Sequence, residues 1–409
     1  MIRLTNSTCR SGLGASLVLL CLSFIAVFTT PPAQAQTLTT LHTFTGQMDG
    51  GAPQGLVAVD RAGNVYGSDP DGGSYRGGAV FRASNKNGAW TLIPIYDFQR
   101  GQDGSDPLGG VTLGPDGAIY GTTLYGGGAG CTDNMGCGTV FRLTPQASFC
   151  RMVLCPWTET VIYRAVNPSD PSVLVGAVIV DNAGNVYGMS VAGGTDNCGA
   201  VYKLSPSGGS YTLSEPYSFQ CGDDGADSLG TLGMDAAGNL YGMATYGGQF
   251  GYGTVFKLVH SAGGYTFQLL YSFTGGADGA MPVSNVVLDS AGNMYGASGE
   301  GGGIFQITPS GTFTLIDTQA SFMQAPISID AAGSIYGTTY TGGTHDAGTI
   351  FKLAYSNGVW THTILHSFDG NDGALPLSGV AFDSSGNLYG TTTFAGGPAD
   401  DGTLWQLTP

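Results

Sequence analysis

Lysine and glutamate are scarce in this chain of 409 residues, which contains only four lysines and three glutamates. Both residues are common on helical surfaces, so their scarcity argues against a helical protein. Glycine, with 70 residues, is instead abundant, as are serine, threonine, aspartate and aromatic residues. This composition is typical of short strands joined by tight turns.

Basic residues of either kind are also few. Beyond residue 35, the chain has 11 basic and 29 acidic residues, which gives a net charge of −18. Such a surface repels phosphate groups, so we expect no nucleic-acid partner and no binding to anionic membranes. Cations and neutral glycans are compatible with this charge.

Long apolar runs are absent after residue 35, and the single one covers residues 13–28. It follows a basic start and precedes an A-x-A pattern at residues 33–35, which together predict a secretory signal peptide over residues 1–35. A membrane anchor is the alternative, since the run is nearly long enough to span. We expect residues 36–409 to form one soluble domain that is secreted, in the periplasm or at the cell surface, without membrane insertion.

A phrase close to D-x-x-G-N-x-Y-G returns seven times, at spacings of 41 to 67 residues. Repeats of about this length are typical of propellers and solenoids. The copy around Asp235 contains four strand patterns, at residues 229–235, 239–245, 254–258 and 265–273, each bounded by a turn signal. Four antiparallel strands per repeat predict the blade of a β-propeller. The tyrosines of the seven copies are Tyr66, Tyr120, Tyr187, Tyr241, Tyr295, Tyr336 and Tyr389.

The two ends of the chain complete the blade count. Residues 38–44 resemble the fourth strand of the last complete repeat, residues 363–368, and the chain ends after a third strand at residues 403–407. The N-terminal segment would therefore complete the last blade and remove an open sheet edge. The sequence predicts an all-β fold, a seven-bladed propeller of four-stranded antiparallel blades closed by its N-terminal strand.

An aromatic residue also recurs in every third strand, followed in five copies by a basic residue. We expect these aromatic residues and the seven tyrosines to pack between blades, because neighbouring sheets must bury their faces against each other. The basic residues suit ion-paired or solvated edge positions. The aromatic residues are Phe81, Phe141, Tyr202, Phe256, Phe305, Phe351 and Trp405, and the basic ones are Arg82, Arg142, Lys203, Lys257 and Lys352.

Three phrases, G-N-x-Y-G, G-T-V-F-[KR]-L and F-x-G-x-D-G, resemble the GloVer tandem-repeat proteins, which are secreted bacterial proteins described as carrying a "choice of anchor". The resemblance covers essentially all of residues 36–409. It implies the repeat but no catalytic residue. A C-terminal anchor is missing from this sequence, which favours release over surface attachment.

Asp-Gly pairs recur in the loops between each fourth strand and the next first strand. Carboxylates and backbone carbonyls in such loops suit calcium, although Asp-Gly is also a preferred turn. The spacing of a known calcium loop is absent, so both interpretations stay open. The calcium candidates are Asp49, Asp103, Asp224, Asp278 and Asp372.

Six cysteines follow residue 35, and an even number in an exported chain predicts disulfides. We expect Cys131 to pair with Cys137 and Cys150 with Cys155, with Cys198 and Cys221 forming the third bridge. A zinc site is the alternative, but the spacing does not favour it. The bridged loops would be a binding surface or a means of holding irregular insertions in place.

Motifs for known catalytic sites are absent: there is no G-x-S-x-G elbow, no Walker loop and no H-E-x-x-H. The leading hypothesis is a monomeric, secreted, non-catalytic module that binds a carbohydrate or protein ligand on one propeller face. The alternative is an extracellular polysaccharide-active enzyme, a lyase or glycosidase, with its site on the loop-rich face. This face carries the loops between second and third strands and the loops between each fourth strand and the next first strand. A third hypothesis is a structural component of an envelope or matrix.

Overall fold

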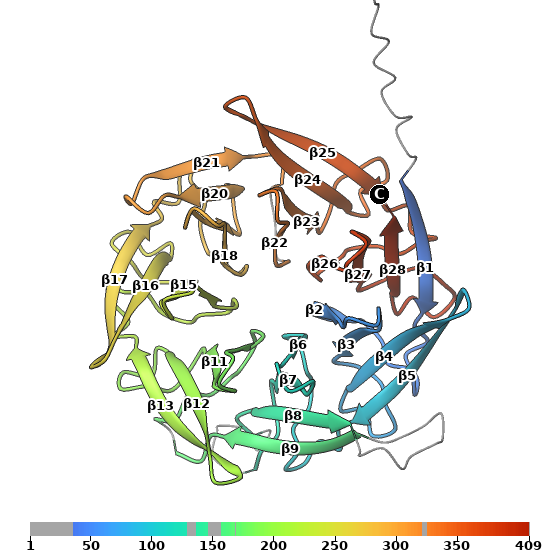
Figure 1. The fold of residues 1–409 in the computed structure, drawn as a ribbon, viewed down its shortest axis with the longest axis horizontal. Helices are drawn as coiled ribbons and strands as arrows, with labels where there is room; N and C mark the ends of the chain where they lie inside the picture. The colour runs from blue at the N-terminus through green and yellow to red at the C-terminus, as the bar shows by residue number, and fades with distance from the viewer. Residues whose placement is uncertain (1–35, 129–135, 146–156, 168, 321–324, 409) are drawn as a thin grey trace, which may run out of the picture. The chain divides into compact units, whose positions relative to one another are not determined.

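Seven four-stranded antiparallel sheets make up the fold, arranged as blades in a ring (Figure 1). The computed structural model describes residues 36–128, 136–145, 157–167, 169–320 and 325–408. These residues form 28 strands, and the seven-bladed propeller predicted from the sequence is confirmed. The signal peptide predicted over residues 1–35 lies outside the described residues. No helix that could cross a membrane occurs in the described part of the chain.

Blades one to three follow each other along the chain, each running from the centre of the ring outwards (Figure 1). Their strands are β2 (Gln54–Val59), β3 (Val65–Asp69), β4 (Ala79–Lys86) and β5 (Ala89–Asp97) in blade one, β6 (Val111–Leu113), β7 (Ile119–Thr123), β8 (Thr139–Pro145) and β9 (Trp157–Arg164) in blade two, and β10 (Ile179–Val180), β11 (Val186–Met189), β12 (Ala200–Ser207) and β13 (Ser210–Ser218) in blade three.

Blades four to seven repeat this order, and the last blade takes its outer strand from the N-terminus. The strands are β14 (Gly233–Met234), β15 (Leu240–Ala244), β16 (Thr254–Ser261) and β17 (Gly264–Ser272) in blade four, β18 (Val287–Leu288), β19 (Met294–Ala297), β20 (Ile304–Ile307) and β21 (Phe313–Asp317) in blade five, β22 (Ser328–Ile329), β23 (Ile335–Thr339), β24 (Thr349–Ser356) and β25 (Val359–Ser367) in blade six, and β26 (Ala381–Phe382), β27 (Leu388–Thr392), β28 (Thr403–Thr408) and β1 (Thr37–Thr43) in blade seven.

The N-terminal strand closes the ring as predicted. Strand β1 pairs with β28 from Thr37 opposite Thr408 to Thr43 opposite Thr403. The Phe44 N–H continues the contact by donating to the Gly402 carbonyl oxygen at 3.0 Å. Closure gives the backbone groups of β28 partners on both sides, so blade seven has no open third strand.

The D-x-x-G-N turn between the first two strands of each blade is held by its own aspartate. In blade four, Asp235 accepts hydrogen bonds from the Ala237 and Asn239 backbone amides, both at 2.9 Å. The Asn239 side chain and the Tyr241 hydroxyl donate to its other oxygen at 2.7 and 3.0 Å. Gly238 has a φ of 80°, a conformation that glycine adopts without strain. The recurring phrase therefore encodes a turn together with the buried tyrosine that fastens it.

Blades pack on each other through the third-strand aromatic residues, which are at most 1% exposed, and this confirms their predicted core position. Phe256 of blade four lies 5.3 Å, between ring centroids, from Phe219, which follows the outer strand of blade three. The same core cluster contains Tyr187 and Leu240 from the two blades. Such contacts join each blade to the next, because a single sheet cannot bury its own face.

The basic residues after these aromatics lie against the repeat tyrosines, since the strand register places them opposite each other. Lys257 and Lys352 place their ammonium groups 5.1 Å from the ring centres of Tyr241 and Tyr336. Arg142 forms an ion pair with Asp116 at 2.7 Å. These positions are occupied by contacts within one blade, which agrees with a structural role.

The innermost strand of blade four is shorter than expected. The sequence pattern predicts a first strand over residues 229–235 in blade four, whereas β14 covers only Gly233–Met234. The preceding residues run along the centre of the ring, where the blades converge. A Cβ atom on Gly230 would lie 2.0 Å from the Ser284 carbonyl oxygen of the next blade. Contact with a neighbouring blade therefore replaces strand pairing in this segment.

Candidate functional site

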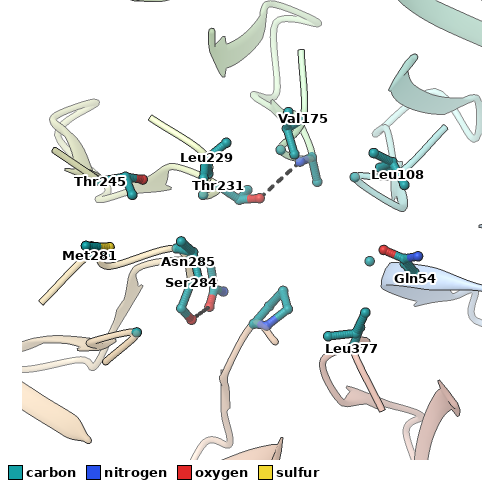
Figure 2. Close-up of a pocket in the computed structure, with 18 of the residues that line it drawn as sticks. Gln54, Leu108, Val175, Leu229, Thr231, Thr245, Met281, Ser284, Asn285 and Leu377 are labelled. Atoms are coloured by element: carbon teal, nitrogen blue, oxygen red, sulfur yellow. Dashed lines mark hydrogen bonds between the residues drawn. The ribbon is translucent and has the colours of Figure 1, made fainter. Parts of the chain in front are cut away.

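A cavity of about 410 Å³ lies at the centre of the ring, where one segment from each blade approaches the axis (Figure 2). In blades two to seven these segments precede the innermost strand, whereas Gln54 is the first residue of β2. The cavity lies on the side of the loops between second and third strands, because Tyr246 and Glu300 of these loops also line it. Each described segment contributes the residue three positions before a buried aliphatic residue, and residue 324 of blade six lies outside the described part. The contributed residues are Gln54, Leu108, Val175, Leu229, Val283 and Leu377.

Polar groups in the cavity wall hold neighbouring blades together. The Ala177 N–H of blade three donates to Thr231 Oγ1 of blade four at 3.1 Å (Figure 2). Asn285 of blade five exchanges two bonds with the Ile327 backbone of blade six, at 3.0 and 2.8 Å. These groups are already engaged, so a ligand would meet mainly the apolar ring and the backbone around it.

Ionisable groups are nearly absent from the wall of the cavity. Among its described lining residues, Glu300 is the single carboxylate and Tyr246 the single phenol, and no histidine, cysteine, lysine or arginine lines it. Acid–base catalysis normally uses two groups with different protonation states within reach of one substrate. The described wall offers shape, apolar contact and a few hydroxyl and amide groups, which suit binding.

A second set of side chains lies at the start of each loop between second and third strands, and two of its members, Tyr246 and Glu300, also line the cavity. Its backbone pairs with the loop before the first strand, as in the bridges of Ala226 with Tyr246 and Ala374 with Phe394. Tyr246 and Phe394 are 44% and 41% exposed, far more than the core aromatics. The residues at this position are Asp71, Tyr125, Ala192, Tyr246, Glu300, Thr341 and Phe394.

Sequence reasoning predicted neither the cavity residues nor the residues at the start of the loops between second and third strands. The cavity residues occupy one repeat position but vary from glutamine to leucine and valine, so no motif marks them. The second set of residues had a usable signal, an aromatic residue directly before Gly126-Gly127 and Gly247-Gly248. This signal is confined to a few blades, and blade-specific residues are the ones that a repeat pattern hides.

The Asp-Gly loops bring each candidate calcium ligand onto its own loop backbone. Asp103 accepts from the Tyr96 hydroxyl at 3.1 Å and from the Gln99 and Gly101 amides at 2.8 and 3.2 Å. Asp224 and Asp278 accept the same three kinds of bond in their loops. These three carboxylates therefore hold turns.

The other two candidates, Asp49 and Asp372, accept from histidines instead, His42 at 3.0 Å and His366 at 2.6 Å. Among the described residues, no three acidic, histidine or cysteine side chains form a group that could hold a metal. Turn formation accounts for Asp103, Asp224 and Asp278, and contacts with histidines occupy Asp49 and Asp372. Calcium at these five positions stays a prediction.

A disulfide joins Cys198 to Cys221, with their Cα atoms 5.4 Å apart, as predicted. It links the loop between β11 and β12 to the loop that follows β13, so it braces the loop-rich side of blade three. Cys137 is also disulfide-bonded. The other candidates, Cys131, Cys150 and Cys155, lie outside the described residues, and their predicted pairing stays a prediction.

Comparison with known families identifies the repeat. The model of the Gloeobacter/Verrucomicrobia repeat matches residues 26–160, 132–325 and 298–409, which together cover most of the chain. The chain belongs to this family. The resemblance inferred from the repeat phrases is thereby confirmed. No curated protein matches this Gloeobacter/Verrucomicrobia repeat protein by sequence.

Solved structures similar to this Gloeobacter/Verrucomicrobia repeat protein include a streptogramin B lyase, with a TM-score of 0.59 and 14% identity over 92% of this chain and 99% of that one. Virginiamycin B lyase from Staphylococcus aureus matches with a TM-score of 0.56 and 15% identity, over 91% and 99% of the two chains. Its catalytically inactive histidine-to-alanine variant, solved with quinupristin, gives a TM-score of 0.57 at 15% identity, over 91% and 99%. At this identity the likeness shows a shared fold alone.

Proposed function

We propose that this protein is an extracellular, non-catalytic binding module that takes its ligand over the central cavity on the loop-rich face. The observation that carries the proposal is the cavity of about 410 Å³, whose described wall is mainly apolar and has one carboxylate. Sites for small molecules are typically concave and mostly apolar, with few polar groups, and have volumes of about 300–1,000 Å³.

A neutral carbohydrate is the ligand class that the surrounding surface favours. Tyr246 lines the cavity with a partly exposed ring, and Tyr252 on the same loop is 41% exposed. Phe394, which is also exposed, holds the position of Tyr246 in blade seven. Aromatic side chains combine a large apolar face with, for tyrosine, a polar tip, which suits a sugar ring and its hydroxyls. The acidic surface disfavours anionic ligands. A protein ligand is the other class that fits an exposed, partly aromatic face.

A predicted signal peptide supports an extracellular site of action. The pattern of residues 1–35 is that of a signal peptide, and the Cys198–Cys221 bridge is of a kind that persists in oxidising compartments. A polysaccharide-active enzyme is the weaker alternative. A glycosidase would need two carboxyl groups facing one bond, and the described cavity wall has only Glu300.

The test is a glycan array probed with the purified protein and three variants. Leu229→Arg places a charge in the cavity and Tyr246→Ala removes a ring at its edge, whereas Ala331→Arg alters an exposed turn on the opposite face and serves as the control. We expect binding to a neutral glycan that both face variants weaken at least tenfold and the control retains.

Two other outcomes of the array would contradict the proposal. Binding lost equally in Ala331→Arg would place the ligand elsewhere, and a blank array followed by capture of a protein partner would exclude the carbohydrate. Incubation of each bound glycan and analysis of its products tests the enzyme alternative, because cleavage would show catalysis.

A further inference from the structure

Blade one departs from the other blades at the end of its second strand. In blades two, six and seven, this position and the facing start of the third strand are two threonines, whose hydroxyls lie 2.9, 2.8 and 2.9 Å apart. Blade one has Asp69 opposite Ala79. A carboxylate thus replaces a pair of neutral hydroxyls that satisfy each other.

The outer strand of blade one adds a second carboxylate to the same row. Asp97 of β5 pairs with Ala79, so Asp69, Ala79 and Asp97 lie side by side with their side chains on one face of the sheet. Blades three and four have Ser218 and Ser272 at the position of Asp97, and their hydroxyls accept loop amides at 2.7 and 2.9 Å. Blade one therefore carries two acids with only a methyl group between them.

Neither oxygen of Asp69 has a hydrogen-bond partner, and its side chain is 0% exposed. The Gly51 N–H lies close enough to favour the charged form, but it donates to the Asp71 carbonyl oxygen at 2.9 Å. Asp97 accepts from the Ser74 hydroxyl with one oxygen, while the other is buried without a partner. Three buried carboxylate oxygens thus lack a donor, which is costly for the folded state.

The charges around Asp69 make this arrangement harder to explain as a structural device. Burial raises the pKa of Asp69 well above its usual range, and the nearby Asp97, Asp71 and Asp49 raise it further. Asp317, the buried acid on the outer strand of blade five, instead meets His362 at 3.1 Å. Neither Asp69 nor Asp97 has a basic partner among the described contacts. Both acids therefore lie without a balancing positive charge.

Both acids lie against glycines, whose missing side chains make space for the carboxylates. A Cβ atom on Gly50 would lie 2.2 Å from Asp69 Oδ2, and one on Gly73 would lie 3.2 Å from both Asp97 Oδ1 and the Gly78 carbonyl oxygen. The glycine loops therefore border the row with carboxylate and carbonyl oxygens. Hard cations with oxygen ligands, calcium above all, use such mixed sets of carboxylates, backbone carbonyls and water.

We propose that Asp69 and Asp97 bind a calcium ion in blade one, with backbone carbonyls of the two adjoining glycine loops and water completing its coordination. Two carboxylates suffice, because calcium accepts six to eight oxygens of several kinds. The two carboxylates of this site are not among the five aspartates of the Asp-Gly turns, although the loop of Gly50 also carries Asp49, and this pair of acids occurs once among the described blades. It is independent of ligand binding at the central cavity.

The test compares calcium binding and thermal unfolding of the purified protein in calcium and in a chelator. Isothermal titration should give one site with a dissociation constant of about 0.1–1 mM or tighter, a range found for extracellular modules. Saturating calcium should raise the unfolding temperature by about 2 °C or more. Magnesium at the same concentration should have a smaller effect, because it requires a tighter octahedral geometry.

The decisive variant combines Asp69→Thr with Ala79→Thr, which rebuilds the threonine pair of blades two, six and seven. We expect it to fold in chelator, to bind calcium at least tenfold more weakly and to lose the calcium-dependent shift. Asp97→Ser, the residue of blades three and four, should weaken binding likewise. Asp223→Asn, which removes an exposed loop carboxylate, is the matched control and should keep both signals.

Unchanged calcium binding in the threonine-pair variant would overturn the proposal, as would a native protein that ignores 10 mM calcium in both measurements. Loss of calcium binding in the Asp223→Asn control would also overturn it, since the ion would then sit elsewhere on the acidic surface.

Discussion

At the scale of single residues, the repeat works by coupling each buried tyrosine to an aspartate. Burial opposes ionisation of Asp235, but hydrogen bonds from the Asn239 side chain and backbone outweigh it, so the pKa of Asp235 lies below its usual range. The Tyr241 hydroxyl adds a further bond at 3.0 Å. A tyrosine that the sequence marks as core is thus also a polar fastener at its tip.

Removing this fastener should destabilise the protein in steps. Tyr241→Phe loses one hydrogen bond and should lower the free energy of unfolding by about 0.5–1.5 kcal/mol. Asp235→Ala loses all four bonds of the turn and should lower it by about 2 kcal/mol or more. Urea unfolding measures both, with the exposed Ala236→Ser in the same turn as control. Equal effects of the two variants would contradict this account.

Glu159 should make stability depend on pH. Burial, with Asp103 nearby, raises the pKa of Glu159 to about 7 against an ordinary value of 4.5, although Arg164 opposes the shift. The folded state therefore binds the proton more tightly than the unfolded state. The contribution of protonated Glu159 to stability is complete below about pH 4.5 and is lost as the pH rises through about 7.

Glu159→Gln should remove this part of the pH dependence. At pH 8 the free energy of unfolding of the variant should be about 1–2 kcal/mol higher than that of the native protein. This is less than the full pKa shift implies, because the side chain is partly solvated. At pH 4.5 the two proteins should differ little. Urea unfolding at both values checks the effect, and parallel curves for the two proteins would contradict it.

At the scale of elements, the outer strand of the last blade comes from the other end of the chain. Strand β1 contributes seven residues to the sheet with β28, and Phe44 after it is fully buried. Leu38 and Leu41 pack against core clusters on either side. The strand is thus both a hydrogen-bonded edge and a part of two hydrophobic cores.

A chain that begins at residue 46 should therefore be less stable than one that begins at residue 36. We expect a fall in unfolding temperature of about 5 °C or more, or association through the exposed edge of β28. Thermal melts and light scattering after gel filtration measure both effects. A synthetic peptide of residues 36–45 should restore stability by strand addition. If the shortened chain had an unchanged unfolding temperature and the peptide had no effect, the role of β1 would be contradicted.

The elements also show how far the sequence predicts this molecule. Turn phrases and aromatic periodicity give the seven blades, their closure and the buried tyrosines, because these features recur in every repeat. The row of Asp69 and Asp97 escapes prediction, since neither acid belongs to a repeated phrase and the cross-strand register decides which acids meet. The cavity residues escape for a similar reason: Gln54 and Leu108 share a place in the ring but no chemistry.

At the scale of the whole molecule, the ring has no privileged starting blade. Hydrogen bonds cross every boundary near the axis, as from Thr122 of blade two to the Gly176 carbonyl and from Thr391 of blade seven to the Pro53 carbonyl. Thr37 lies opposite Thr408, so the two chain ends of the propeller are neighbours.

Circular permutation should accordingly be tolerated at an exposed turn and fail at the axis. Joining residue 408 to residue 37 by a short linker and opening the chain between Gly208 and Gly209 should leave the unfolding temperature within about 3 °C of the native value. Opening it between Gly230 and Thr231 cuts the cavity wall and should prevent folding. Thermal melts of both permutants test this expectation. Similar unfolding temperatures for the two would contradict the difference between the exposed turn and the axis.

The pairing of β1 with β28 also sets an order on biosynthesis. Residues 37–43 are the first strand to leave the ribosome, yet their partners, residues 403–408, follow about 360 residues later. At a synthesis rate of about 5–20 residues per second, the first strand waits for roughly 20–70 s. During that interval it is an unpaired strand, available to chaperones or export factors. A protein sealed by its earliest strand reaches its native state only after its last residues have been made.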